Sequence, residues 1–167
     1  MKHFALILLA VFVSEYGFSA VRNELSKESL LIELTGKDYS KISDSQLYAE
    51  LIASYQASNE VGFQSRLQRF MSQYPQSPFA DNALYVAGKM ALEAKNYPQS
   101  IRYFQRVQQE YPRSNRLVSS MFAKARAYRQ MNLIEQSRNS FKDVIKKFPG
   151  SPEAFQAESE LRLMGTL

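Results

Sequence analysis

The sequence contains no cysteine and no tryptophan, and its single histidine is His3. The lack of cysteine excludes disulfide bonds, thiol catalysis, zinc–thiolate sites and the lipid-carrying cysteine of a bacterial lipoprotein. The six glycines form neither a Gly-x-Gly nor a Gly-Lys pattern, so a phosphate-binding glycine loop is also missing. Without a nucleophile beside a base, a metal cluster or such a loop, we expect no enzymatic activity, no cofactor and no metal.

The composition is that of a folded protein with a small excess of basic residues. Of the 167 residues, 45% are hydrophobic and 22% are charged, which supplies apolar material for one core. Lysine and arginine number 21 against 16 acidic residues, and they are scattered along the sequence. The net charge of +5 favours an acidic partner but is too small to predict nucleic-acid binding.

The N-terminal segment differs from the rest of the sequence. An apolar run, Phe4–Val13, follows a basic start and precedes several small residues, and it is too short to cross a bilayer comfortably. This layout predicts a secretory signal peptide at residues 1–20, cleaved after Ser19 or Ala20. An uncleaved anchor and an N-terminal helix packed on the remaining residues are the alternatives. We therefore expect a periplasmic protein that is not a lipoprotein and whose mature form has no transmembrane segment.

A repeat with a period of 37 residues runs through the remaining sequence. A Tyr/Phe-Pro-x-Ser motif begins at Tyr74, Tyr111 and Phe148, and we call residues separated by this period a column. Between the motifs, each unit has two apolar stripes at helical spacing, split by a short polar stretch such as Lys95-Asn96. Each unit is therefore predicted to be a helix hairpin, with Asn96 capping a second helix.

The period predicts an all-α solenoid of about three helix hairpins, followed by a single helix that covers the last open face. We expect this repeat domain to occupy residues 44–167, with hairpins at 45–74, 78–111 and 115–148 and the capping helix at 152–164.

The segment between the signal peptide and the repeats is predicted to be an N-terminal helix or linker at residues 21–43. Four leucines within residues 22–34 and a glycine at Gly36 favour a helix that ends there. Such a helix either covers the opposite end of the array or contacts a neighbouring molecule.

Small residues mark where the two helices of a hairpin must approach closely. Gly88 and Ser100 fill this role in the second unit, and a glycine inside a helix costs about 1 kcal/mol relative to alanine. Gly88 therefore predicts close packing. The first unit departs from this pattern, because Leu51 and Phe63 stand in the same two columns.

The sequence from Tyr74 to Ser114 resembles bacterial cell-envelope tetratricopeptide (TPR) proteins. The resemblance extends from Asp44 to Met164 and rests on Tyr74-Pro-Gln-Ser-Pro-Phe-Ala-Asp-Asn-Ala-Leu-Tyr, Asn96-Tyr97-Pro98-Gln99-Ser100-Ile101 and Tyr111-Pro112-Arg113-Ser114. The TPR domain of the CpoB/YbgF type, from the Tol-Pal system, is our first choice, and BamD-type outer-membrane assembly proteins are the second. The sequence lacks the N-terminal coiled coil of the first type and the lipidated cysteine of the second. Its period exceeds the usual 34 residues of a TPR because of a longer Tyr-Pro-x-Ser loop, which is typical of envelope members.

The resemblance implies a non-enzymatic, protein-binding scaffold or adaptor of the bacterial cell envelope, in Tol-Pal-linked envelope maintenance or cell division. The alternative is a structural subunit of an outer-membrane, export or pilus assembly complex, as in the BamD type. Release by osmotic shock would favour the first function, and tight retention in a membrane complex would favour the second. The expected partner is another protein, and a homo-oligomer is left open.

An array of helix hairpins has a concave face lined by the first helix of each hairpin, and a peptide or helix of a partner is expected to bind there. Helical periodicity places an aromatic or apolar set and a cationic set on this face. The candidate partner-binding residues are Tyr48, Ile52, Tyr55, Tyr85, Lys89, Phe122, Arg126 and Arg129. The cations suit an acidic segment or the C-terminal carboxylate of a partner, so replacing Arg126 and Arg129 by glutamate is expected to weaken binding.

Each part of this set also has a purely structural interpretation. Aromatic residues in the column of Tyr48 and Tyr85 are common in TPR helices, where they pack on neighbouring repeats. The cluster of Lys89, Arg126 and Arg129 is equally compatible with an ordinary solvated face, because exposed charges are the default for such residues.

Overall fold

The computed structural model describes residues 34, 36 and 42–165. These described residues form seven α-helices and no strand. Among them, no helix combines the length and the apolar character that crossing a membrane requires.

The protein divides into two units, residues 1–43 and residues 44–167, and all seven helices belong to the second unit. The predicted signal peptide at residues 1–20 lies outside the described residues. The same holds for the predicted helix at 22–34, apart from Leu34.

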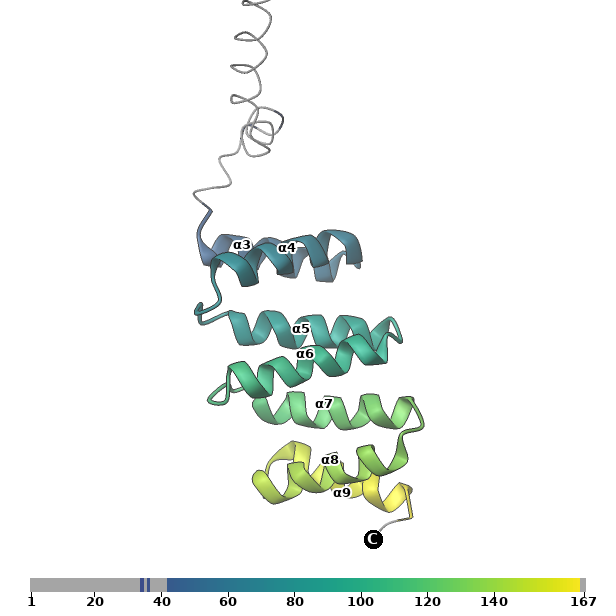
Figure 1. The fold of residues 1–167 in the computed structure, drawn as a ribbon. Coiled ribbons are helices and arrows are strands. Elements are labelled where there is room, and N and C mark those ends of the chain that lie inside the picture. Colours follow the sequence, from purple (N-terminus) through teal and green to yellow (C-terminus); the bar gives the residue numbers. More distant parts are fainter. Residues whose placement is uncertain (1–33, 35, 37–41, 166–167) are drawn as a thin grey trace, which may run out of the picture. The chain divides into compact units, whose positions relative to one another are not determined.

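The helices of the second unit form three hairpins and one closing helix, which follow one another in sequence order (Figure 1). They are α3 (Asp44–Gln56), α4 (Glu60–Gln73), α5 (Ala80–Glu93), α6 (Tyr97–Glu110), α7 (Leu117–Gln130), α8 (Ile134–Lys147) and α9 (Pro152–Leu163). Each second helix packs on the first helix of its own hairpin and on that of the next. The prediction of an all-α, TPR-like array with a capping helix is confirmed.

The turn inside each hairpin repeats one backbone geometry. Ser58, Lys95 and Asn132 have positive φ angles of 53°, 59° and 58°. The amide of the next residue donates to a carbonyl five positions back, as the Asn96 amide does to the Ala91 oxygen at 2.8 Å. This is the Schellman arrangement, which satisfies the last carbonyls of the first helix while the backbone reverses direction.

The same turn residue begins the second helix of the hairpin. The Asn96 side chain accepts a hydrogen bond from the amide of Gln99 at 3.4 Å, and Asn59 accepts one from Gly62 at 2.9 Å. Leu133 occupies this column in the third hairpin and provides no side-chain cap. The predicted capping role of Asn96 is confirmed.

The loops between hairpins tie each hairpin to the preceding one. The Ser77 hydroxyl donates to an oxygen of Asp44 at 2.7 Å, and the Ser114 hydroxyl donates to Asp81 at 2.5 Å. Each bond joins the serine of the Tyr-Pro-x-Ser motif to the first helix one hairpin earlier. In the third hairpin Val118 stands in the aspartate column, so that helix has no carboxylate for the next serine.

Within each of the last two hairpins, a buried serine joins the two helices. The Ser100 hydroxyl donates to the Gly88 carbonyl at 2.8 Å, and the Ser137 hydroxyl donates to the Ala125 carbonyl at 3.0 Å. A Cβ atom at Gly88 would lie 2.5 Å from the Phe104 ring, which is closer than real Cβ contacts. The close approach predicted from Gly88 is therefore confirmed.

The first hairpin fills the equivalent space with larger side chains. Leu51 and Phe63 stand in the columns of Gly88 and Ser100 of the second hairpin, and both are fully buried. The helices α3 and α4 therefore pack through apolar contact at a place where the other hairpins use a serine hydroxyl.

The closing helix α9 buries Ala154, Ala157 and Leu161 on one side and leaves Phe155 and Leu163 exposed. Leu161 is buried in the core cluster of the third hairpin. Glu158 and Arg162 stand in the columns that carry Leu84 and Gly88 in α5, where α6 packs. Another helix packed on this side of α9 would bury two charges, so α9 caps the array.

Candidate partner-binding site

The eight predicted partner-binding residues all lie on the first helices α3, α5 and α7. Two of them, Lys89 of α5 and Arg126 of α7, line the same cavity of about 440 Å³. The other lining residues come from the end of α5, the turn after it, the start of α6 and the end of α7: Leu92, Glu93, Lys95, Tyr97 and Gln130. The structure thus brings a predicted cation of one hairpin together with a predicted cation of the next.

A second cavity of about 250 Å³ adjoins the first between α7 and α9. It is lined by Phe122, Arg126, Gln156, Ser159, Glu160 and Leu163. Because Arg126 borders both cavities, they form one surface along α5, α7 and α9, which we call the first-helix groove. Its extent suits a segment of polypeptide, because it crosses the second and third hairpins and the closing helix.

The first of these cavities carries an excess of positive charge. Three of its lining residues are the cations Lys89, Lys95 and Arg126, and its one carboxylate is Glu93. The hydroxyl of Tyr55 donates to Glu93 at 3.1 Å, and the Lys89 ammonium lies 5.7 Å from the centre of the Tyr55 ring. Among the residues that the structure describes, neither Lys95 nor Arg126 forms a hydrogen bond or an ion pair through its side chain. These two cations are therefore available to a carboxylate of a partner.

On α3, the predicted aromatic residues contact the second hairpin. The ring of Tyr48 stacks on Phe79 with centroids 4.7 Å apart, and its hydroxyl accepts a hydrogen bond from the Asn82 amide. Tyr55 spans from α3 to Glu93 of α5. Ile52 lies between them and is half-buried. These contacts give Tyr48 and Tyr55 a role in joining hairpins, and their binding to a partner stays a prediction.

The other two aromatic residues also pack within the array. The ring of Tyr85 lies 6.0 Å from Phe104, and the Arg116 guanidinium sits 5.2 Å from the Tyr85 centroid. Phe122 is only 9% exposed and packs on Phe141 at 5.5 Å. Tyr85 therefore contacts the next hairpin through Arg116, in line with the structural alternative considered for it, and Phe122 packs on the second helix of its own hairpin.

Arg129 differs from the other two predicted cations because it has an acidic partner within the protein. Its guanidinium forms an ion pair with Glu160 of α9. This pair neutralises Arg129 beside the groove, whereas Lys89 and Arg126 keep their charges available. The pair Lys89 and Arg126 is accordingly a better target for charge reversal than Arg126 and Arg129.

Sequence reasoning missed the contribution of the hairpin turn and of α9 to the groove. Lys95 follows the end of α5, and Tyr97 begins α6, so neither lies on the helical stripe from which candidates were chosen. Gln156 and Leu163 belong to the closing helix, which sequence reasoning treated only as a cap. The turn was already visible in the sequence, and including its residues would have found Lys95.

The groove supplies cations, amides and apolar surface for binding. Among the described residues, no group of three or more histidine, aspartate or glutamate side chains is placed to hold a metal ion. The cations of the first-helix groove can donate charge-assisted hydrogen bonds to a carboxylate, and Leu92 and Leu163 provide an apolar contact surface beside them.

Comparison with known proteins identifies one family. Residues 80–158 match the model of the YfiO family, described as outer membrane lipoprotein, and no curated protein matches the sequence. The matched residues begin with α5 and reach into α9, so they contain the second and third hairpins and both cations Lys89 and Arg126. The match supports the resemblance to BamD-type outer-membrane proteins, whereas no comparison confirms the resemblance to the CpoB/YbgF type. Across two of its three hairpins, the protein is similar to an outer membrane lipoprotein family.

Proposed function

We propose that this protein is a non-enzymatic, protein-binding subunit of an outer-membrane assembly complex of the bacterial cell envelope. The observation that carries the proposal is the YfiO family match over residues 80–158, because it covers the hairpins that form most of the first-helix groove. The array of stacked hairpins supports it, since repeats of this kind present extended surfaces to other proteins. The family match favours this function over a Tol-Pal adaptor in cell division, which stays an untested prediction.

In this function the first-helix groove holds an acidic segment of a partner protein. Lys89, Lys95 and Arg126 provide three positive charges, and the Tyr55 hydroxyl engages the only carboxylate of that cavity. A partner carboxylate placed between α5 and α7 would accept charge-assisted hydrogen bonds from two hairpins at once. Apolar contact with Leu92 and Leu163 would add to the affinity.

The protein would act at the periplasmic face of the outer membrane. The matched family is described as a lipoprotein, yet this sequence contains no cysteine to carry a lipid. We therefore infer that contacts with other proteins hold it at the membrane. The predicted signal peptide at residues 1–20 would provide export.

Fractionation of cells tests this function. The tagged full-length protein is expected to remain with the outer-membrane fraction after osmotic shock and to leave it when high salt or detergent disrupts protein contacts. Release of most of the protein by osmotic shock, as a free monomer or small oligomer, would instead support a periplasmic adaptor. Retention that resists salt and needs detergent alone would indicate a lipid anchor.

A further inference from the structure

Another cavity, separate from the two cavities of the first-helix groove, lies between α4 and α6, the second helices of the first two hairpins. It has a volume of about 570 Å³, which is within the range of ligand-binding sites. Its walls are Gln64, Ser65, Leu67, Gln68, Met71 and Ser72 of α4, and Gln99, Arg102, Tyr103 and Arg106 of α6. We call this cavity the polar cleft; the two predicted cations of the first-helix groove do not line it.

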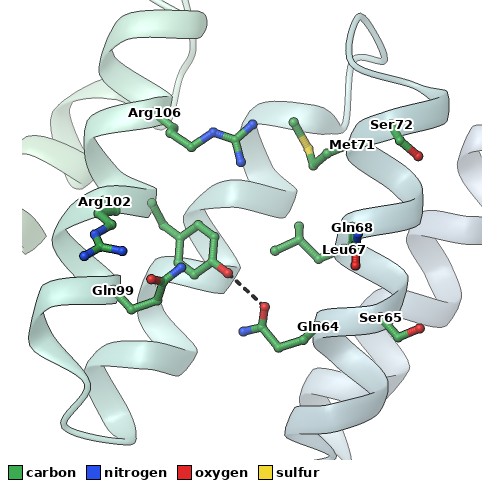
Figure 2. A pocket seen from close by; sticks show the side chains of 10 residues that line it. Gln64, Ser65, Leu67, Gln68, Met71, Ser72, Gln99, Arg102 and Arg106 are labelled. Atoms are coloured by element: carbon green, nitrogen blue, oxygen red, sulfur yellow. Dashed lines mark hydrogen bonds between the residues drawn. The ribbon is translucent and has the colours of Figure 1, made fainter.

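Figure 2 shows how the polar cleft is built. Gln64 and Leu67 extend from α4 toward α6, and Arg102 and Arg106 lie along the α6 side. The Tyr103 hydroxyl donates to the Gln64 side-chain oxygen at 2.8 Å and bridges the two helices. Tyr103 is 7% exposed and Leu67 is 3% exposed, so they form the apolar floor. The rim is made of amides, hydroxyls and two guanidinium groups.

The charge of the polar cleft has one sign. Both charged lining residues are arginines, and none of the ten described lining residues is acidic. Glu110, outside the lining, engages Arg106 through two hydrogen bonds, at 2.7 Å and 3.1 Å. Arg102 is exposed and forms no ion pair within the described residues. A carboxylate entering the cleft would therefore meet the free guanidinium of Arg102, whereas Arg106 is already neutralised by Glu110.

At the equivalent place between the second and third hairpins, other side chains join the helices. There the Lys124 ammonium donates to the Gln108 side chain at 3.0 Å, and Asp143 lies nearby on α8. Burial lowers the pKa of Lys124, as expected for an ammonium held inside a join between helices. The contact between the second and third hairpins thus contains both a cation, Lys124, and a carboxylate, Asp143.

Between the first and second hairpins, the columns of Lys124, Gln108 and Asp143 carry different residues. Ala87 replaces Lys124, Met71 replaces Gln108, and Arg106 replaces Asp143. Ala87 is fully buried and brings no charge to this place, and the carboxylate found between the second and third hairpins is replaced by the guanidinium of Arg106. The polar cleft therefore lacks the cation and carboxylate found between the second and third hairpins, and the guanidinium of Arg102 has no acidic partner within the described residues.

We propose that the polar cleft binds an extended, acidic segment of a second partner protein. The glutamine amides and serine hydroxyls along its rim can donate to and accept from a peptide backbone, and the arginines select carboxylates. Nucleic acid fits less well, because Tyr103, the only aromatic lining residue, is buried and offers no face for base stacking. This inference goes beyond the proposed function: the cleft lies on the second helices, so two partners can bind at once.

Fluorescence anisotropy with a labelled peptide of alternating glutamate and serine tests the proposal. The full-length protein is used with Lys89→Glu and Arg126→Glu in place, so that binding to the first-helix groove is removed. Arg102 is replaced by asparagine because Asn139 stands in the same column of the next hairpin. Arg102→Asn is expected to raise the Kd about fivefold, because one exposed charge pair contributes about 1 kcal/mol. Gln68→Glu, which adds a carboxylate to the rim, is expected to weaken binding at least as much.

Controls separate the cleft from general charge attraction. Arg113→Asn removes an exposed positive charge from a loop outside the cleft and is expected to leave the Kd within about twofold, because distant exposed charges are screened by salt. The same peptide with glutamine in place of glutamate is expected not to bind. The proposal is overturned if the acidic peptide does not bind in the double-variant background, if Arg113→Asn weakens it as much as Arg102→Asn, or if a DNA oligonucleotide displaces it. None of these outcomes bears on the first-helix groove.

Discussion

At Gly88, the helices α5 and α6 approach so closely that a single methyl group has no room. Phe104, the residue that a Cβ would meet, is fully buried and has no space to retreat. Gly88→Ala should therefore lower the free energy of unfolding by about 1–2 kcal/mol, because overpacking outweighs the gain in helix propensity of about 1 kcal/mol. Urea unfolding followed by circular dichroism measures this loss.

Gly62 provides the matched control for that substitution. A Cβ there would meet only the side chains of Asn59 and Arg66, both near the surface. Gly62→Ala should accordingly cost less than Gly88→Ala. Equal stability of Gly88→Ala and the unaltered protein would contradict the close approach of α5 and α6.

Tyr111 links two successive loops and makes stability depend on alkaline pH. Its hydroxyl donates to the Pro75 carbonyl at 2.8 Å, and burial raises the pKa of its phenol above 10.0. Well below pH 10.0 the phenol is protonated in both the folded and the unfolded protein, so its contribution is complete. As pH rises from there through the folded pKa, the unfolded phenol ionises first and this contribution is lost.

Tyr111→Phe should lower the free energy of unfolding near neutral pH by about 1 kcal/mol, the usual contribution of one hydrogen bond. It should also reduce the loss of stability above about pH 10, the ordinary pKa of a phenol. Thermal or urea unfolding across this pH range is the measurement. Tyr128→Phe is the control, because its hydroxyl makes no hydrogen bond among the described residues. An unchanged alkaline profile in Tyr111→Phe would argue against the loop-to-loop bond.

On the scale of one element, the hairpin turn is under local backbone strain that differs between repeats. Ser58 has a φ of 53° and Asn132 has a φ of 58°. Asparagine tolerates this left-handed conformation better than serine does, so the strain is greater at Ser58. Ser58→Gly should raise the free energy of unfolding by about 0.5–1 kcal/mol, and Asn132→Gly should change it by less. Chemical denaturation of both variants tests the difference. A gain at Asn132 larger than that at Ser58 would be inconsistent with this explanation.

The helices themselves were predictable because local signals mark many of their boundaries. The prolines of the Tyr/Phe-Pro-x-Ser motifs stop the second helices, Asn59 and Asn96 begin them, and the apolar stripes have one period throughout. All these signals act within a few residues, so one sequence is enough to place them. Those helix boundaries follow from these local signals.

The binding surface was less predictable because it depends on contacts between distant residues. The pairing of Arg129 with Glu160 requires the register of α9 against α7, which no periodicity reveals. The polar cleft likewise depends on how α4 and α6 face each other, since the Tyr103 hydroxyl donates to Gln64, 39 residues earlier in the sequence. Tyr48 illustrates the same limit, since its position on α3 was predicted but its stacking on Phe79 was not.

On the scale of the whole array, we predict that charge reversal in the first-helix groove separates binding from folding. Lys89 is half-buried and Arg126 is exposed, and neither forms an ion pair within the described residues. Lys89→Glu combined with Arg126→Glu should keep the helical circular dichroism and lower the free energy of unfolding by no more than about 1 kcal/mol, the value of the lost contact between Lys89 and the Tyr55 ring. Loss of the folded state in this double variant would mean that the two cations are needed for the array itself.

Native electrophoresis of detergent-solubilised envelopes, with detection of the tagged protein, tests the central claim most directly. Partners in the band are identified by mass spectrometry. We expect the unaltered protein to migrate within a complex that contains outer-membrane assembly proteins, and the Lys89→Glu, Arg126→Glu variant to migrate as free, folded protein. The claim is contradicted if the unaltered protein migrates alone, or if the double variant remains in the complex to the same extent.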